Sequence, residues 1–273
     1  KAAEREGALF SSEPLVLDCL SRLNVDLSFE ASELITRKFK SENLSTVINI
    51  VDGVLNVDAD SGQFSGGSFS LDFGIDSRAK PYKTDVHFVI DGLVVNQIPA
   101  LQGVKLPLQG DVDLDIEISS RGDSLKEIAS TTSGTILASG RNTYFPASGM
   151  DFLTQSILAQ ILGLVNPKKK EQFHEVQCGV IGFRLVDGVV ISRDTIALQS
   201  EDVTFLIRGG LSLADESIVF LIRPKARKGA GVSAATLTNF YRIGGTLSRP
   251  QLQADPEGVL KTGATWGLAA VTG

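Results

Sequence analysis

Long stretches of the chain alternate apolar and polar residues with a period of two, the pattern of a β-strand with one apolar and one wet face. The clearest is residues 106–119 (LPLQGDVDLDIEIS), where leucine, valine and isoleucine alternate with aspartate and glutamate. A second run covers residues 15–31 and, at about 3.3 Å per residue, predicts a strand of roughly 55 Å. Such strands raise the question of what covers their apolar side.

Short turn signals separate further alternating runs and predict a series of β-hairpins. Val/Ile-Asp-Gly occurs at residues 51–53, 90–92 and 186–188, and glycine pairs occur at 66–67, 209–210 and 244–245. Asp-Gly connects antiparallel strands because glycine adopts positive φ easily. The spacing of these turns is irregular, so they predict repeated sheet construction rather than a solenoid of fixed period.

Two segments change to a helical period. Residues 122–129 contain Ser124 and, three residues later, Glu127, which is the spacing of a capping box. Residues 150–165 place apolar side chains at helical spacing, and they predict the one substantial helix. This helix, followed by three lysines at 168–170, could lie on a membrane surface. We favour the alternative that it plugs an open end of the sheet, with the lysines near its C-terminal dipole.

The long strands favour one open sheet over a sandwich. In a sandwich two apolar faces cover each other, and strands of ordinary length suffice. An open sheet leaves an apolar trough, which soluble monomers rarely expose unless a ligand or partner occupies it. Acyl chains suit such a trough because they need almost no directional hydrogen bonding. We predict a mainly β fold: a long, strongly curved antiparallel sheet that forms a hydrophobic groove, with one substantial helix and one or two short helices.

We expect the apolar sides of the separate strands to share one face and to line this groove. The candidate groove residues are Leu23, Val25, Leu27, Phe29, Phe69, Leu71, Phe73, Val86, Phe88, Val112, Leu114 and Ile116. We expect residues 1–273 to form a single elongated region that is part of a longer protein.

Composition and charge exclude several classes of protein. The 273 residues are 42% hydrophobic and 21% charged, enough for a sizeable core. A net charge of −6 argues against a nucleic-acid surface, which needs clustered lysine and arginine. Cys19 and Cys178 fit no zinc pattern, and we expect both to be buried small apolar residues, a disulfide being the less favoured alternative. No apolar run is long enough to span a membrane.

Candidate catalytic and metal-binding residues have ordinary structural explanations. Residues 111–115 mimic the start of an EF-hand loop, but Ile116 stands where that loop needs glycine, and acids with period two are the wet face of a strand. For His87 and His174 we favour surface or packing roles. The sequence has no nucleophile elbow and no phosphate-binding glycine loop. We therefore expect neither an enzyme nor a cofactor or metal site.

The order of several short motifs resembles the C-terminal region of AsmA-like proteins. The first group is FSGGSF at 64–69, LQGDVDL at 108–114, GDSL at 122–125 and SGT at 133–135. The second group is the run at 173–188, GGLSL at 209–213, GGTLSRP at 244–250 and Asp-Pro at 255–256. The resemblance covers nearly the whole chain from about residue 15 onward, and the sequence departs from the family pattern at 225–231.

The resemblance implies a periplasmic protein of a Gram-negative bacterium, tethered by an N-terminal helix in the inner membrane. It implies a repeating β-groove that carries phospholipids between the inner and outer membranes, with acyl chains and the membrane as partners and no catalytic residues. The alternative function is a structural β-sandwich module that holds other envelope proteins. A dry interior between two sheets would favour the alternative, and an open apolar groove would favour lipid.

Overall fold

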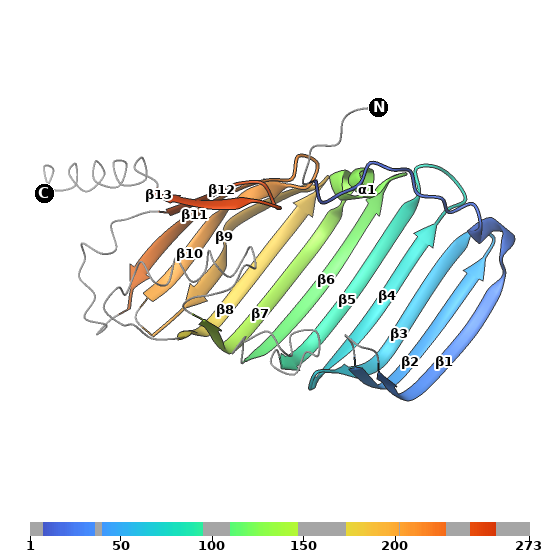
Figure 1. Cartoon of the computed structure of the whole chain (residues 1–273), viewed down its shortest axis with the longest axis horizontal. Helices are drawn as coiled ribbons and strands as arrows, with labels where there is room; N and C mark the ends of the chain where they lie inside the picture. The colour runs from blue at the N-terminus through green and yellow to red at the C-terminus, as the bar shows by residue number, and fades with distance from the viewer. Residues whose placement is uncertain are drawn as a thin grey trace, which may run out of the picture.

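The computed structural model of the chain describes residues 8–35, 40–94, 110–146, 173–201, 203–227 and 241–254. In this part of the chain, thirteen strands form one sheet, and each strand is hydrogen-bonded to its neighbours in sequence. All the pairings are antiparallel, and Figure 1 shows the strands side by side along the long axis of the molecule. The predicted mainly β, antiparallel fold is confirmed.

Most strands are longer than the common five or six residues. They are β1 (Val25–Ile35), β2 (Lys40–Val51), β3 (Val54–Phe64), β4 (Gly67–Asp76), β5 (Lys83–Val94), β6 (Asp111–Arg121), β7 (Ser133–Pro146), β8 (Phe173–Val186), β9 (Val189–Gln199), β10 (Val203–Ser212), β11 (Ser217–Ala226), β12 (Tyr241–Gly245) and β13 (Pro250–Ala254). The helical elements of the described residues are a 3₁₀ turn, η1 (Leu20–Arg22), and a short helix, α1 (Leu125–Thr131).

The predicted strand over residues 15–31 is wrong in its first half, because β1 begins only at Val25. The preceding residues cross the ends of other strands: Pro14 forms a β-bridge with Ser124, and the Leu15 amide donates to the Asp123 carbonyl at 2.7 Å. The chain then turns through η1, where Leu20 is buried. Alternation alone could not reveal this path, since it depends on hydrogen bonds to residues more than 100 positions away.

Residues 9–24, here called the strap, continue along the α1 end of the sheet (Figure 1). At the far end of the strap, the amides of Leu9 and Phe10 donate to the carboxylate of Glu216 at 2.9–3.0 Å. Glu216 lies in the turn between β10 and β11, while the strap leads directly into β1. The strap therefore connects the start of β1 with the turn between β10 and β11.

Two of the three predicted Asp-Gly turns are confirmed. Asp52 and Gly53 have φ of 49° and 82°, and Asp187 and Gly188 have 47° and 70°, which are the positive values of a type I′ hairpin turn. The predicted turn at residues 90–92 is wrong, because these residues lie inside β5. Gly92, with φ of 66°, forms a bulge in the pairing with β6.

The predicted glycine-pair turns have different outcomes. Ser65 and Gly66 form the turn between β3 and β4, with φ of 48° and 83°. Gly209 and Gly210 instead lie within β10, where a Cβ on Gly209 would meet the backbone of Val219 on β11. This glycine is needed for close approach of two strands rather than for a turn.

Asp113 stabilises the β5 bulge. Its carboxylate accepts the Gly92 amide at 2.9 Å and the Ser139 hydroxyl at 3.0 Å, and Arg141 lies 3.9 Å away. The Gly92 hydrogen bond, followed by that from Ser139, holds the pKa of Asp113 below its ordinary value. This stabilisation is therefore present above the ordinary pKa and is lost as the pH falls through the lowered one.

We expect Asp113→Asn to reduce the acid sensitivity of the protein, since an asparagine oxygen can still accept the Gly92 amide without the charge. At neutral pH the variant should lose on the order of 0.5–1 kcal/mol, a small value because Asp113 is partly exposed. The difference from wild type should shrink below about pH 4. Denaturant unfolding between pH 7 and pH 2 measures this. Parallel curves for the two proteins would contradict it.

The predicted short helix over residues 122–129 is confirmed as α1. Ser124 caps it and accepts the Glu127 amide at 3.2 Å, while the Glu127 carboxylate accepts the Asp123 amide at 2.7 Å. This is the reciprocal bonding of a capping box, except that the Glu127 carboxylate accepts the amide of Asp123 instead of that of the cap residue Ser124. The predicted helix at residues 150–165 lies outside the described residues.

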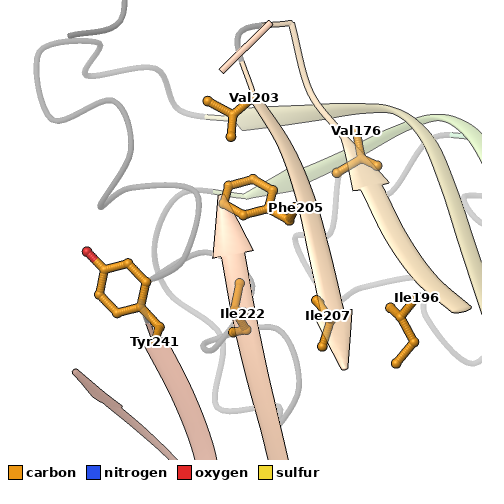
Figure 2. Packing of buried hydrophobic residues seen from close by; sticks show 7 residues of the cluster. All are labelled: Val176, Ile196, Val203, Phe205, Ile207, Ile222 and Tyr241. Carbon is orange, nitrogen blue, oxygen red and sulfur yellow. The ribbon is translucent and has the colours of Figure 1, made fainter. Parts of the chain in front are cut away.

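The compact core lies toward the C-terminal strands. Its buried members come from β8 to β12 and are Val176, Ile196, Val203, Phe205, Ile207, Ile222 and Tyr241 (Figure 2). Ile222, Val203 and Phe205 are the most enclosed, at 0%, 1% and 1% exposed. Phe183 and Phe220 pack against this cluster with ring centroids 6.2 Å apart. At this end of the sheet these apolar side chains are therefore enclosed.

Candidate functional site

The apolar sides of the strands combine into one face, here called the apolar face. Directly paired residues of antiparallel strands point to the same side of a sheet. One row of such pairs crosses eleven strands from β1 to β11: Leu27, Ile48, Val57, Phe73, Val86, Ile118, Gly134, Leu185, Val190, Leu211 and Ile218. No member of this row is polar, so the alternation of separate strands is in phase across the sheet.

The structure brings nearly all the predicted groove residues onto this face. Paired residues place Phe29 with Thr46, Leu71 with Phe88, and Ile90 with Leu114, all in rows that share the face of Leu27. The expectation that Leu27 and Leu114 share one face is confirmed, whereas their binding role stays a prediction. Leu23 is the exception: it follows η1 and lies before β1, so it belongs to no row of the sheet.

Several residues of the apolar face were not among the predicted candidates. They include Ile48, Ile50, Leu55, Val57, Ile75, Ile90, Ile118, Ile136, Ile181 and Phe183. Their strands show the same period-two alternation, so the sequence pattern could have identified these residues too. The register of strand pairing places them beside the predicted residues.

Exposure of the apolar face changes along the sheet. On β1, Leu27 and Phe29 are 49% and 43% exposed. The face is mostly half-buried from β2 to β8, where Leu114 and Phe88 lie. It is buried at β10 and β11, where Ile207 and Ile222 belong to the compact core. The part of the apolar face that remains accessible is therefore on β1 to β8.

The opposite side, here called the reverse face, is acidic over the first six strands. Asp58, Asp72 and Glu117 lie in one row with His87, whose Nδ1 is 3.4 Å from Asp72 Oδ2 and whose Nε2 is 3.8 Å from Asp115 Oδ1. Asp58, Asp72, His87 and Glu117 help to line a hollow of about 560 Å³. A hollow with this charged lining does not suit an acyl chain.

The other candidate features of the sequence lie apart from the apolar face. The described residues contain no group of three or more histidine, cysteine, aspartate or glutamate residues that could hold a metal ion. The prediction that Cys19 and Cys178 are buried is wrong: both thiols are free and exposed. Cys19 lies in the strap and Cys178 on the reverse face of β8, so neither takes part in the apolar face. Among the described residues, no helix is both long and apolar enough to cross a bilayer.

Comparison with known families agrees with this geometry. The model of the AsmA family matches residues 1–195, which include β1 to β8 and the accessible part of the apolar face. The chain belongs to the AsmA family. This AsmA-family chain is thereby placed among proteins associated with the bacterial envelope. Neither a curated protein nor a solved structure matches the chain.

Proposed function

We propose that the accessible part of the apolar face binds phospholipid acyl chains as the floor of a curved hydrophobic groove. The protein would carry phospholipids between the inner and outer membranes and so support outer-membrane biogenesis. In this proposal it works in the periplasm, anchored to the inner membrane by an N-terminal segment. No catalytic step and no cofactor is part of it, and we propose little headgroup selectivity.

The uninterrupted apolar face is the observation that carries this proposal. With strands about 4.8 Å apart, the face from β1 to β8 extends for roughly 34 Å, similar to the hydrocarbon thickness of a bilayer. An acyl chain lying across the strands meets apolar side chains at each step, from Leu27 on β1 to Ile118 on β6. The uniform lining offers no preferred stopping point, which suits movement along the face.

The energetics agree with reversible binding. Burial of a CH₂ group is worth about 0.8 kcal/mol, so a sixteen-carbon chain that covers half its surface gains roughly 6 kcal/mol relative to water. A bilayer covers the whole chain and offers more. Bound lipid is thus kept out of water but is released readily to a membrane, as transfer requires.

The sandwich alternative has less support. Within the described ranges, all thirteen strands belong to one sheet, and the strands β1 to β7 have no second sheet against their apolar side. The packed interior that a sandwich needs is confined to the cluster around Phe205 and Ile222. A sandwich would also bury the apolar side of β1 to β8 against a second sheet, whereas most of this side is half-buried or exposed.

Site-specific photo-crosslinking in living bacteria tests the proposal. A photoreactive amino acid at Phe73 or Phe88 would project from the apolar face, and one at Asp72 or His87 would project from the reverse face of the same strands. We expect phospholipid adducts at Phe73 and Phe88, detected by mass spectrometry, at tenfold or more the yield of the reverse-face positions.

Asp72 and Phe73 are neighbours in sequence, so the comparison keeps strand and depth constant and changes only the face. Equal adduct yields on both faces would contradict the proposal. The absence of phospholipid adducts at Phe73 and Phe88, with protein adducts there instead, would favour the structural alternative.

A further inference from the structure

The reverse face changes character between β6 and β8. Following one row of paired residues, Asp58, Asp72, His87 and Glu117 of β3 to β6 are succeeded by Thr135 on β7, Arg184 on β8, Ile191 on β9, Gly210 on β10 and Val219 on β11. The row is continuous, so one side of the sheet carries an acidic half and a half with arginine and aliphatic residues. The acyl-binding proposal uses neither half.

The second half exposes two pairs of aliphatic side chains on β7 to β11. Leu137, Val180, Ile191 and Val219 are between 39% and 58% exposed. Leu137 and Val180 lie next to Gly182 on β8, and Ile191 on β9 and Val219 on β11 both pair with Gly210 on β10, so each pair adjoins a glycine without a side chain. Single exposed aliphatic residues are normal on soluble proteins, but a group of them marks an interaction surface.

Cationic side chains surround this group. Arg184 on β8, Arg208 on β10, Lys225 on β11 and Arg242 on β12 lie on the reverse face. In the ladder positions that the structure describes on this side of β7, β8, β10 and β11, there is no carboxylate. Asp187 and Asp215 stand in the turns at one end of these strands. The surface thus combines aliphatic and basic groups, with its acids at the rim.

We propose that this half of the reverse face docks the protein on an anionic lipid bilayer. Aliphatic side chains enter the interface between headgroups and acyl chains, and arginine binds lipid phosphates through bidentate hydrogen bonds. The acidic half is repelled by the same membrane, so the protein is oriented with β8 to β12 toward it. The apolar face lies on the other side of the sheet and stays open.

A second copy of the chain is the competing occupant. Its acidic half would complement the arginines, but the same carboxylates would then be buried against Ile191, Val180 and their neighbours. Burial of a carboxylate against aliphatic groups is unfavourable without a partner for each charge. A bilayer presents phosphates and apolar surface at different depths and therefore satisfies both kinds of side chain.

Vesicle co-sedimentation of the full chain tests the proposal. We expect at least tenfold tighter binding to vesicles of phosphatidylcholine with a quarter phosphatidylglycerol than to phosphatidylcholine alone, with weakening at 0.5 M salt. Ile191→Ser and Arg184→Glu should each weaken this binding at least fivefold. Their matched controls are Val47→Ser on the acidic half of the reverse face and Lys126→Glu on α1, which should bind like wild type.

Each outcome decides the question. Unchanged binding by folded Ile191→Ser and Arg184→Glu would overturn the proposal, as would equal binding to neutral and anionic vesicles. A dimer in sedimentation velocity that Ile191→Ser dissociates, without vesicle binding, would assign the surface to a second copy instead. Loss of vesicle binding in a Leu27→Ser variant, with unchanged binding by Ile191→Ser, would assign the bilayer contact to the apolar face instead. Because the variants lie on opposite faces, failure of docking and failure of acyl binding are distinguishable.

Discussion

Leu114→Asp is expected to lower the phospholipid recovered with the protein at least tenfold. Leu114 lies on the apolar face of β6, half-buried between Ile90 on β5 and Ala138 on β7. A carboxylate there has only apolar neighbours in its row, and an acyl chain that crosses β6 would bury it without a partner, which is costly. The measurement is phospholipid per protein by mass spectrometry after purification from bacteria.

Val47→Asp is the control, since it adds the same charge to the reverse face of β2, where Val47 is already 38% exposed. It should retain the wild-type amount of lipid. Leu27→Asp adds the charge to the exposed start of the apolar face and should reduce recovery without affecting the compact core. Wild-type lipid content in a folded Leu114→Asp variant would contradict the expectation, as would an equal loss in Val47→Asp.

Phe205→Ala is expected to destabilise the protein by about 3–5 kcal/mol, the usual cost of a cavity left by a buried phenylalanine. Phe205 is 1% exposed on β10 and packs within the cluster that closes the C-terminal end of the apolar face. Removing its ring leaves a cavity, because the hydrogen-bonded strands on both sides cannot move together to fill the space. Denaturant unfolding measures the change in the free energy of unfolding.

Phe29→Ala is the matched control, because the same truncation is made on the same face at β1, where the ring is 43% exposed. It should cost less than about 1 kcal/mol. If both variants lose equal stability, the apolar face is packed uniformly, and the distinction between an accessible part and a closed end is wrong.

Alternation along the sequence determined which side of each strand is apolar. Val86 and Phe88 on β5, and Leu114 and Ile116 on β6, were assigned correctly, because side chains of an extended backbone must alternate. Local chemistry also determined the I′ turn at Asp52-Gly53 and the Ser124 cap of α1, since both depend on residues within one turn. These features need no distant partner.

Predictions failed where a distant partner decides the conformation. Residues 15–24 alternate like a strand, yet hydrogen bonds to Asp123 and Glu216 make residues 9–24 a strap across the sheet. The Asp-Gly at 91–92 resembles a turn, but Asp113 on β6 and pairing with β6 hold it as a bulge. Cys178 was expected to be buried, and it lies exposed on the reverse face of β8.

The sequence by itself determined that this protein consists of two-faced strands with turns between them and a capped short helix. Only the tertiary structure decided how the faces combine, because the register of each pair sets whether neighbouring strands are in phase. Register aligned Leu27 with Ile118 in one apolar row and placed Ile191 beside Arg184 on the other side of the sheet. The tertiary structure also decided that the cluster around Phe205 is buried while the apolar side of β1 is exposed, since burial depends on what lies against a strand and not on the pattern within it.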